Sequence, residues 1–333
     1  MKVGIIGLGY WGPNLVRNFL SHKEVNEVYG CDKSEVRLRF IESRYPEVKL
    51  TNKWEEIVSN HGLDLVAIST PVATHFQLAK QALENGKHVW VEKPFTLNSK
   101  EAETLIDLAE KKNLKIFVDH TFIYTGAVRK IKEIVDKKIL GNIMYFDSVR
   151  INLGLFQHDV NVIWDLACHD FSIMDYLLGK KIIGITSNGI ANYYELENIA
   201  HIAVYFEDNC FAHVHVNWTS PVKIRRVLIG GQKKMLVWDD MLPTEKIKVY
   251  DSGVDVQSAE DVHKMLVQYR TGDMYSPKVN ETEALSLGVS EFISAINENR
   301  RPLTNGEDGL RVVKILEAAE ESIKNKGKFI ELI

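Results

Sequence analysis

The chain has 333 residues, 45% apolar and 26% charged, which predicts a soluble protein of two domains with ordinary hydrophobic cores. Its net charge of −4 argues against a nucleic-acid partner, and no apolar run reaches the roughly 18 residues of a membrane span. Cys31, Cys168 and Cys210 are too scattered for a disulfide framework or a zinc knuckle, so a cytoplasmic protein is expected.

The first 120 residues alternate short apolar runs with amphipathic helical patterns. The apolar runs cover residues 3–6, 25–31, 63–68, 88–91 and 116–118, and the helical patterns include 14–20, 74–85 and 100–112. Strands that alternate with helices predict βαβ units and a parallel sheet. Because the crossovers in such units are right-handed, we expect a doubly wound sheet over residues 1–121.

The rhythm changes after residue 121. Helical patterns at 126–138 and 162–178 flank a strand at 143–151, and strand patterns then follow at 182–190, 199–206, 210–217, 225–229 and 234–238. Two more helical patterns close the chain, at 281–299 and 306–326. Residues 122–333 therefore predict an α+β domain with a mainly antiparallel sheet, one face under helices and one face open. An open apolar face predicts a homodimer or a homotetramer.

A glycine-rich turn follows the first strand and opens the first helix. It consists of Gly7, Leu8, Gly9, Tyr10, Trp11 and Gly12. In a dinucleotide-binding turn the first glycine permits the tight bend, the second admits a pyrophosphate, and the third lets the helix pack on the strand. A plain strand–turn–helix would show the same letters. At this position the pattern favours a Rossmann domain that binds NAD or NADP.

Asp32 ends the second apolar run, 20 residues after Gly12. A carboxylate there binds the ribose hydroxyls of NAD and repels the 2′-phosphate of NADP, so NAD is favoured. The neighbouring Lys33 and Arg37 leave NADP open. The alternative role for Asp32 is the N-cap of the following helix.

Two further segments stand at the carboxyl ends of predicted strands, where a cofactor crevice forms. The candidate cofactor ligands there are Ser69, Thr70, Pro71, His75, Glu92 and Lys93. Lys93 precedes Pro94 and could stabilise a developing alkoxide. The alternative for this loop is structural, with Thr74 as an N-cap and His75 as an ordinary residue of a first helical turn.

Asp165 and His169 lie four residues apart in a predicted helix. A carboxylate one turn from an imidazole can orient it as a general acid or base, although a purely structural contact would show the same spacing. Residues expected to line the substrate cleft are Lys93, Tyr124, Arg150, Asn152, Asp165 and His169, with Asn161 and Trp164 nearby. His213 and His215 alternate on one strand face; a sheet surface or subunit interface is favoured there over a metal site, and no metal is expected.

Together these motifs resemble the Gfo/Idh/MocA family of oxidoreductases over nearly the whole chain. The resemblance also includes the late segment Asn299-Arg300-Arg301-Pro302-Leu303-Thr304. It implies a Rossmann domain, a second domain with an open sheet used in oligomerisation, and catalytic roles for Lys93, Asp165 and His169. Residues 160–164 depart from the glycine-rich stretch of many members and look like members from nucleotide-sugar pathways, including UDP-N-acetylglucosaminuronic acid 3-dehydrogenases.

The sequence therefore predicts an NAD(P)-dependent dehydrogenase or reductase that acts on a carbinol carbon of a sugar or nucleotide-sugar. His169 is expected to be the base, Asp165 to orient it, and Lys93 to hold the oxygen. Three alternatives remain: a protein that senses NAD(P)H without turnover, a reductase of a non-sugar substrate, and a glycosidase-like use of NAD in a redox-assisted elimination. The intact Lys93, Asp165 and His169 argue against the sensor, and the pair of Asp165 and His169 argues against the non-sugar reductase.

Overall fold

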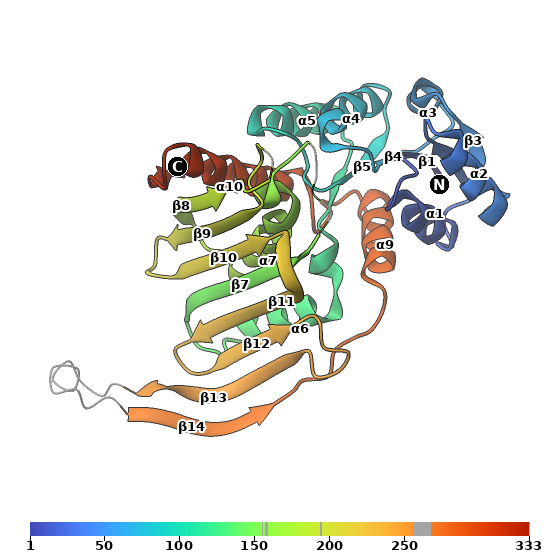
Figure 1. Cartoon of the computed structure of the whole chain (residues 1–333). Coiled ribbons are helices and arrows are strands. Elements are labelled where there is room, and N and C mark those ends of the chain that lie inside the picture. Colours follow the sequence, from blue (N-terminus) through green and yellow to red (C-terminus); the bar gives the residue numbers. More distant parts are fainter. Residues whose placement is uncertain (155, 157–158, 194, 256–267, 333) are drawn as a thin grey trace. The chain divides into compact units, whose positions relative to one another are not determined.

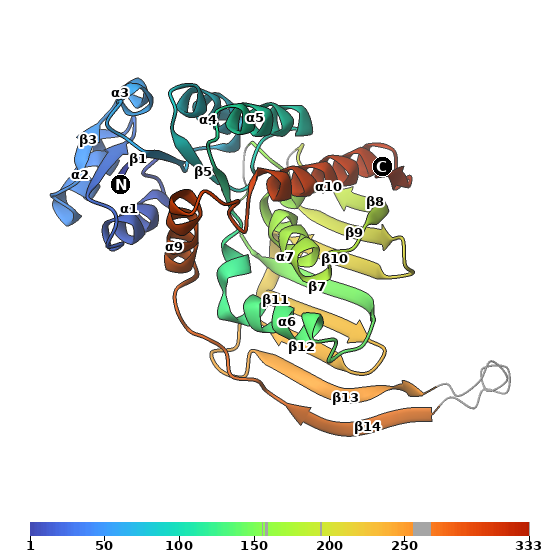
Figure 2. The same cartoon turned by 180° about the vertical axis from the view of Figure 1, so that it is seen from behind.

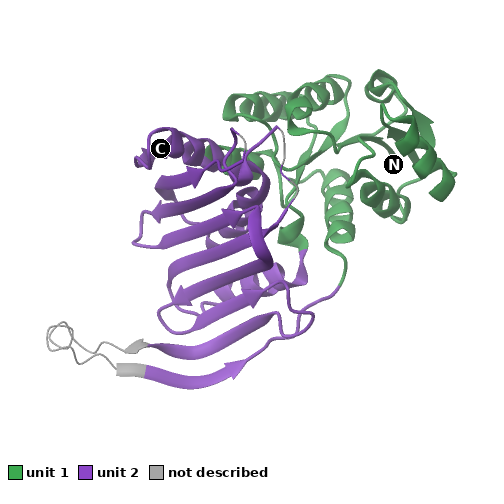
Figure 3. Ribbon diagram, in the orientation of Figure 1, with its two compact units in different colours: residues 1–124, 282–314 green, residues 125–281, 315–333 purple. Residues whose placement is uncertain are grey.

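The computed structural model describes residues 1–333 except 155, 157–158, 194, 256–267 and 333. The chain forms two compact units (Figure 3). Unit 1 contains Met1–Tyr124 and Thr282–Lys314, and unit 2 contains Thr125–Glu281 and Ile315–Ile333. Within the described part of the chain, no helix combines the length and the apolar character that a bilayer crossing requires.

Unit 1 contains a six-stranded parallel sheet in the order β3-β2-β1-β4-β5-β6 (Figure 1). Its strands are β1 (Lys2–Ile6), β2 (Glu27–Cys31), β3 (Lys49–Thr51), β4 (Leu65–Ile68), β5 (His88–Glu92) and β6 (Ile116–Asp119). Its helices are α1 (Gly12–Leu20), α2 (Glu35–Arg44), α3 (Trp54–Ser59), α4 (His75–Glu84) and α5 (Ser99–Lys111), with 3-10 turns at Val72–Thr74 and Thr121–Tyr124. The doubly wound parallel sheet is confirmed; the short β3 was not predicted.

The segment Thr282–Lys314 belongs to unit 1, although it follows the strands of unit 2 in the sequence. It contains α9 (Ala284–Asn297) and the start of α10 (Gly306–Lys324). Phe292 of α9 packs on Trp90 and Phe117, whose stacked rings have centroids 3.9 Å apart. From the sequence, this segment was expected to belong to the second domain. Apolar packing against β5 and β6 instead assigns it to the first unit.

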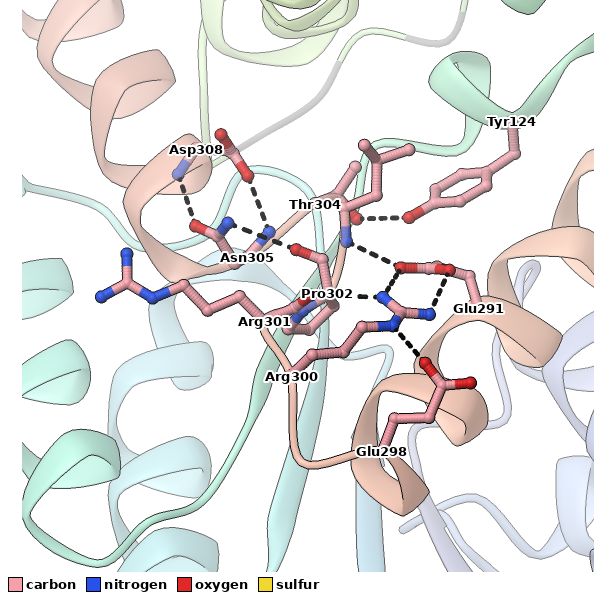
Figure 4. A network of polar contacts seen from close by, with 10 residues as sticks. Tyr124, Glu291, Glu298, Arg300, Arg301, Pro302, Thr304, Asn305 and Asp308 are labelled. Atoms are coloured by element: carbon pink, nitrogen blue, oxygen red, sulfur yellow. Dashed lines mark hydrogen bonds and ion pairs between the residues drawn. The ribbon is translucent and has the colours of Figure 1, made fainter.

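The late segment at residues 299–304, which carried part of the family resemblance, anchors α9 and the start of α10 to the rest of unit 1 (Figure 4). Arg300 donates two hydrogen bonds to Glu291, at 2.6 and 2.9 Å, and the backbone N–H of Leu303 donates to the same carboxylate. The backbone N–H of Val118 in β6 donates to the carbonyl of Thr304. The motif therefore holds α9 and the start of α10 on the edge strand of the parallel sheet.

Unit 2 contains a nine-stranded sheet in the order β14-β13-β12-β11-β7-β10-β9-β8-β15. The strands are β7 (Ile143–Leu153), β8 (Ile182–Ile190), β9 (Ile199–Phe206), β10 (Phe211–Asn217), β11 (Thr219–Gly231), β12 (Met235–Asp239), β13 (Ile247–Asp255), β14 (Gln268–Tyr275) and β15 (Ile330–Glu331). All pairs are antiparallel except β7 with β10. The mainly antiparallel sheet is confirmed; β13, β14 and β15 were not predicted.

Helices cover one face of this sheet (Figures 1 and 2). They are α6 (Gly126–Asp136), α7 (Cys168–Leu178) and the C-terminal part of α10. In β7 the side chains of Phe146 and Ser148 are buried under the helices, whereas the alternate Tyr145 and Asp147 are only partly buried. This alternation is typical of a sheet with one covered face.

Candidate active site

The glycine turn of unit 1 has the geometry that dinucleotide binding requires. Gly7 has φ +98°, and an added Cβ would lie 2.3 Å from the carbonyl oxygen of Ser69. A Cβ on Gly12 would lie 2.2 Å from the carbonyl oxygen of Gly7. A Cβ on Gly9 would meet only the guanidinium of Arg37, at 3.6 Å or more. Gly7 and Gly12 are thus needed by the fold, whereas Gly9 leaves the backbone open to a ligand.

The N-terminus of α1 completes this turn. The residue before α1 makes no side-chain cap, and the first turn contains no acidic residue. The positive end of the α1 dipole therefore favours an anion here, as in dinucleotide sites that hold a pyrophosphate. Tyr10 at the tip is 96% exposed, and the indole of Trp11 turns inward. These residues fit an NAD or NADP cofactor.

Asp32 lies beside the glycine turn. Its Oδ2 accepts a hydrogen bond from the backbone N–H of Leu8 at 2.8 Å, and its Oδ1 accepts one from the N–H of Ser34 at 2.9 Å. Ser34, rather than Asp32, occupies the N-cap position of α2. The guanidinium of Arg37 lies 3.2 Å from Oδ2. The position that was predicted to bind ribose therefore combines a fixed carboxylate with an exposed cation.

His75 joins two of the predicted cofactor segments. Its Nδ1 lies 2.9 Å from the carbonyl oxygen of Pro94 and its Nε2 lies 2.8 Å from that of Thr70. Carbonyl oxygens only accept hydrogen bonds, so both contacts are made at once only by the doubly protonated imidazolium. His75 is buried, and its two contacts link the loop after β4 to Pro94, the residue that follows Lys93. Thr74 donates to the carbonyl of Pro71 and makes no cap of α4.

Glu92 and Asp119 end neighbouring strands and are direct partners in the β5–β6 register. Their carboxyl groups share a hydrogen bond. Burial raises the pKa of both groups, and Lys93 acts on both in the opposite direction. Sequence reasoning missed Asp119, although its place at the carboxyl end of a strand was a usable signal.

In unit 2 the predicted Asp165 and His169 lie at the junction of two helix types. Asp165 is in a π-helical turn, Ile163–Ala167, and His169 is in the first turn of α7. Both side chains are half-buried, so a ligand can reach them. The indole Nε1 of Trp218 donates to Oδ2 of Asp165 at 3.1 Å. Trp218 was not identified from the sequence, and π-helical turns are frequent at functional sites.

Arg150, a predicted substrate ligand, is engaged in a buried ion pair. Its Nε and Nη2 donate to the two carboxylate oxygens of Asp170, at 2.8 and 3.1 Å. Ser148 adds a third hydrogen bond to Asp170 at 2.7 Å. Since Asp170 follows His169, this pair fixes the start of α7 on β7.

The other predicted cleft residues differ in accessibility. Tyr124 is buried in unit 1, and its hydroxyl lies 3.1 Å from that of Thr304 (Figure 4). In unit 2, Asn152 is partly buried on β7. Asn161 donates to Glu197, and the indole of Trp164 donates to Glu320.

His213 and His215 gain a third histidine on the partly exposed face of the sheet. His201 of β9 stands opposite His215 in the register, and their rings stack with centroids 4.1 Å apart. Parallel stacked rings do not direct their nitrogens at one point. Among the described residues, no group of three histidine, cysteine or carboxylate side chains is placed to hold a metal ion.

Comparison with known proteins decides the family. Residues 1–120 match the model of the GFO_IDH_MocA oxidoreductase family with an NAD-binding Rossmann fold, and residues 132–332 match the C-terminal alpha/beta domain of the same family. The chain belongs to this family. It is therefore an NAD(P)-dependent oxidoreductase, and its first domain is an NAD-binding Rossmann domain.

Relatives of this GFO_IDH_MocA chain match it along nearly its whole length. UDP-N-acetylglucosamine 3-dehydrogenase of Acidithiobacillus ferrooxidans is 24% identical, over 94% of each chain. Myo-inositol 2-dehydrogenase of Thermotoga maritima is 21% identical, over 98% of this chain and 97% of that one. The structure of GenD2 from gentamicin A biosynthesis in complex with NAD has a TM-score of 0.83 and 19% identity, covering 100% of this chain and 96% of the other. These relatives are similar in fold and length.

Proposed function

We propose that the chain transfers a hydride between NAD(P) and a carbinol carbon of a sugar or nucleotide-sugar, with C3 of a UDP-N-acetylhexosaminuronate as the leading candidate. The proposed catalytic residues are Lys93, Asp165 and His169. Two related chains are named for such substrates, UDP-N-acetylglucosamine in one and myo-inositol in the other. The observation that carries the proposal is the half-buried Asp165, held by Trp218, four residues before His169.

In the proposed reaction a secondary hydroxyl becomes a ketone. When bound, the oxidised nicotinamide supplies the acceptor for the hydride that leaves the carbinol carbon. His169 takes the hydroxyl proton, and Asp165 stabilises the resulting imidazolium. Lys93 donates a hydrogen bond to the same oxygen and stabilises its developing negative charge. The reverse sequence reduces the ketone.

The test is turnover with a defined panel of substrates. The purified chain is incubated with NAD or NADP and with UDP-N-acetylglucosamine, its uronate, myo-inositol or glucose, and nicotinamide reduction is followed by absorbance. Native mass spectrometry of the isolated chain reports a retained nucleotide or sugar. We expect turnover of at least one sugar and its loss in Lys93→Met. A parallel assay follows NAD(P)H oxidation with an imine or an enal, and turnover there, with none of any sugar, would overturn the substrate class.

We also propose that the chain forms a homodimer or homotetramer through the sheet of unit 2. The face away from α6 and α7 carries Tyr205 and Phe211, whose rings pack edge to face on neighbouring strands, beside the stacked histidines. An aromatic patch on a sheet face is typical of an interface. Sedimentation at micromolar concentration checks this, and a monomer there would refute it.

A further inference from the structure

The carboxyl ends of β5 and β6 place two carboxyl groups side by side. Glu92 and Asp119 are register partners and are hydrogen-bonded to each other. Two neighbouring carboxylates that are both ionised repel each other strongly, so such a pair retains one proton. The question is which residue carries it.

The surrounding donors answer that question. The Thr121 hydroxyl donates to Oδ1 of Asp119 at 2.7 Å, and the Trp11 indole donates to Oδ2 at 3.4 Å. With the bond from Glu92, Asp119 receives three donors. By contrast, Glu92 has the backbone N–H of Lys93 as its one donor, and its Oε1 is buried with no hydrogen-bond partner within the described part of the chain. An ionised carboxylate only accepts hydrogen bonds and needs donors, so the charge belongs on Asp119 and the proton on Glu92.

Two titratable residues, Lys93 and His120, directly follow Glu92 and Asp119 in the sequence. Lys93 follows Glu92 directly and acts electrostatically on both carboxyl groups. His120 follows Asp119, is buried, and has its pKa lowered to about 3 by burial and by the charges of Lys93 and Arg311. His120 is therefore neutral and adds no cation. The cluster then contains one anion, Asp119, beside the ammonium of Lys93.

We propose that Glu92 and Asp119 share one proton that resides on Glu92, and that the remaining charge on Asp119 positions both Lys93 and, through Trp11, the glycine turn. Glu92 and Asp119 are thus positioning residues for the cofactor and for the group that contacts the substrate oxygen. The part that concerns Lys93 rests on the proposed function. The proton assignment and the link to the turn do not.

The proton assignment is tested without any substrate. Melting temperature is measured from pH 5 to pH 9, a range of about four units, in the wild type, Glu92→Gln, Asp119→Asn and the exposed control Asp136→Asn. A carboxyl group whose pKa is raised on folding stabilises the chain at acid pH. This stabilisation decreases as pH rises above the pKa of the group in the unfolded chain, and it is lost once pH passes the pKa in the folded chain. Glu92→Gln keeps the neutral donor, so its melting temperature relative to the wild type should increase with pH. Asp119→Asn should retain a weaker slope of the same sign, because burial still raises the pKa of Glu92 when the charge of Asp119 is removed.

Positioning is tested by rescue. Glu92→Leu removes the donor to Asp119, and Glu92→Gln restores it. We expect kcat/KM and NAD affinity to be at least about 10-fold lower in Glu92→Leu than in Glu92→Gln, the size of one hydrogen bond to a charged group. Asp119→Asn should weaken NAD binding and move the alkaline limb of the pH profile of kcat/KM to lower pH.

The outcomes separate the proposals. A flattened pH dependence in Asp119→Asn instead of Glu92→Gln places the proton on Asp119 and overturns the assignment. Equal behaviour of Glu92→Leu and Glu92→Gln in NAD binding overturns the positioning role. If the stability and NAD-binding results are as expected while no sugar is turned over, the carboxyl pair stands and the proposed substrate class fails.

Discussion

Asp119 in unit 1 and Asp170 in unit 2 are both buried carboxylates, but they are stabilised by different chemistry. Asp170 receives a two-pronged bond from Arg150 and a third from Ser148. Asp119 receives a hydroxyl, an indole and the proton of a second carboxyl group. The first set carries a permanent positive charge, whereas the second depends on a proton that can leave.

This difference separates fixed structure from adjustable electrostatics. An arginine stays protonated at any physiological pH, so the Arg150–Asp170 pair can fix the start of α7 under all conditions. A carboxyl pair changes charge with pH and with the charge of a bound ligand. It therefore suits strand ends at which we propose that a cofactor binds whose charge changes during turnover.

The largest effect is expected at His169, which stands next to the fixed ion pair. If Arg150 and Asp170 only hold α7 in place, His169 is the residue that removes the hydroxyl proton. His169→Asn should lower kcat by about 10²–10⁴, the range for a positioned acid or base. NAD affinity, measured by fluorescence titration, is the control and should stay the same, because His169 belongs to unit 2 and the NAD-binding fold to unit 1. A near-normal kcat would transfer the role of base to Lys93 or to water.

Arg150→Met tests whether the pair in unit 2 is structural. It leaves Asp170 buried without its arginine and should lower the free energy of unfolding by about 3–5 kcal/mol at neutral pH, measured with urea. The double variant Arg150→Met/Asp170→Leu should recover much of the loss. If the single variant were as stable as the wild type, the comparison would fail.

Asp32→Ser tests the charge at the cofactor end of unit 1. The change removes the carboxylate that repels a 2′-phosphate and leaves Arg37, which is 3.2 Å from Oδ2 in the wild type. We expect NAD affinity to fall by about 10-fold and the preference for NAD over NADP to narrow. Calorimetric titration with both nucleotides measures it. Better binding of NADP than of NAD in the unmutated chain would contradict the role given to Asp32.

The smallest effect concerns the histidines on the sheet of unit 2. Burial, with the charges of His201 and His213, lowers the pKa of His215 from 6.5 to about 4. The unfolded chain therefore binds more protons between these values, and stability should fall as pH drops from 6.5 towards 4. His215→Gln should reduce this slope in melting temperature, whereas the exposed control His61→Gln should not. If melting temperature depended on pH equally in both variants, a group other than His215 would cause the loss of stability in acid.

Local patterns predicted much of the fold. The glycine turn, the helix starts and the alternating strands depend on neighbours a few residues apart, and their order was confirmed together with the family. Contacts between distant residues were missed. Trp218 reaches Asp165 across 53 positions, and Val118 pairs with Thr304. No periodicity records such partners, because they are created by the fold.

The return of Thr282–Lys314 to unit 1 has a consequence for synthesis on the ribosome. Residues 1–124 contain all six parallel strands, yet Trp90 and Phe117 acquire their cover from Phe292 only when α9 has been made. A nascent chain that stops before α9 would therefore expose an aromatic surface that binds chaperones or other nascent chains. The chain also passes between the units three times, after Tyr124, Glu281 and Lys314. A gene fragment that ended after Tyr124 would encode the complete parallel sheet without the helix α9 that covers Trp90 and Phe117.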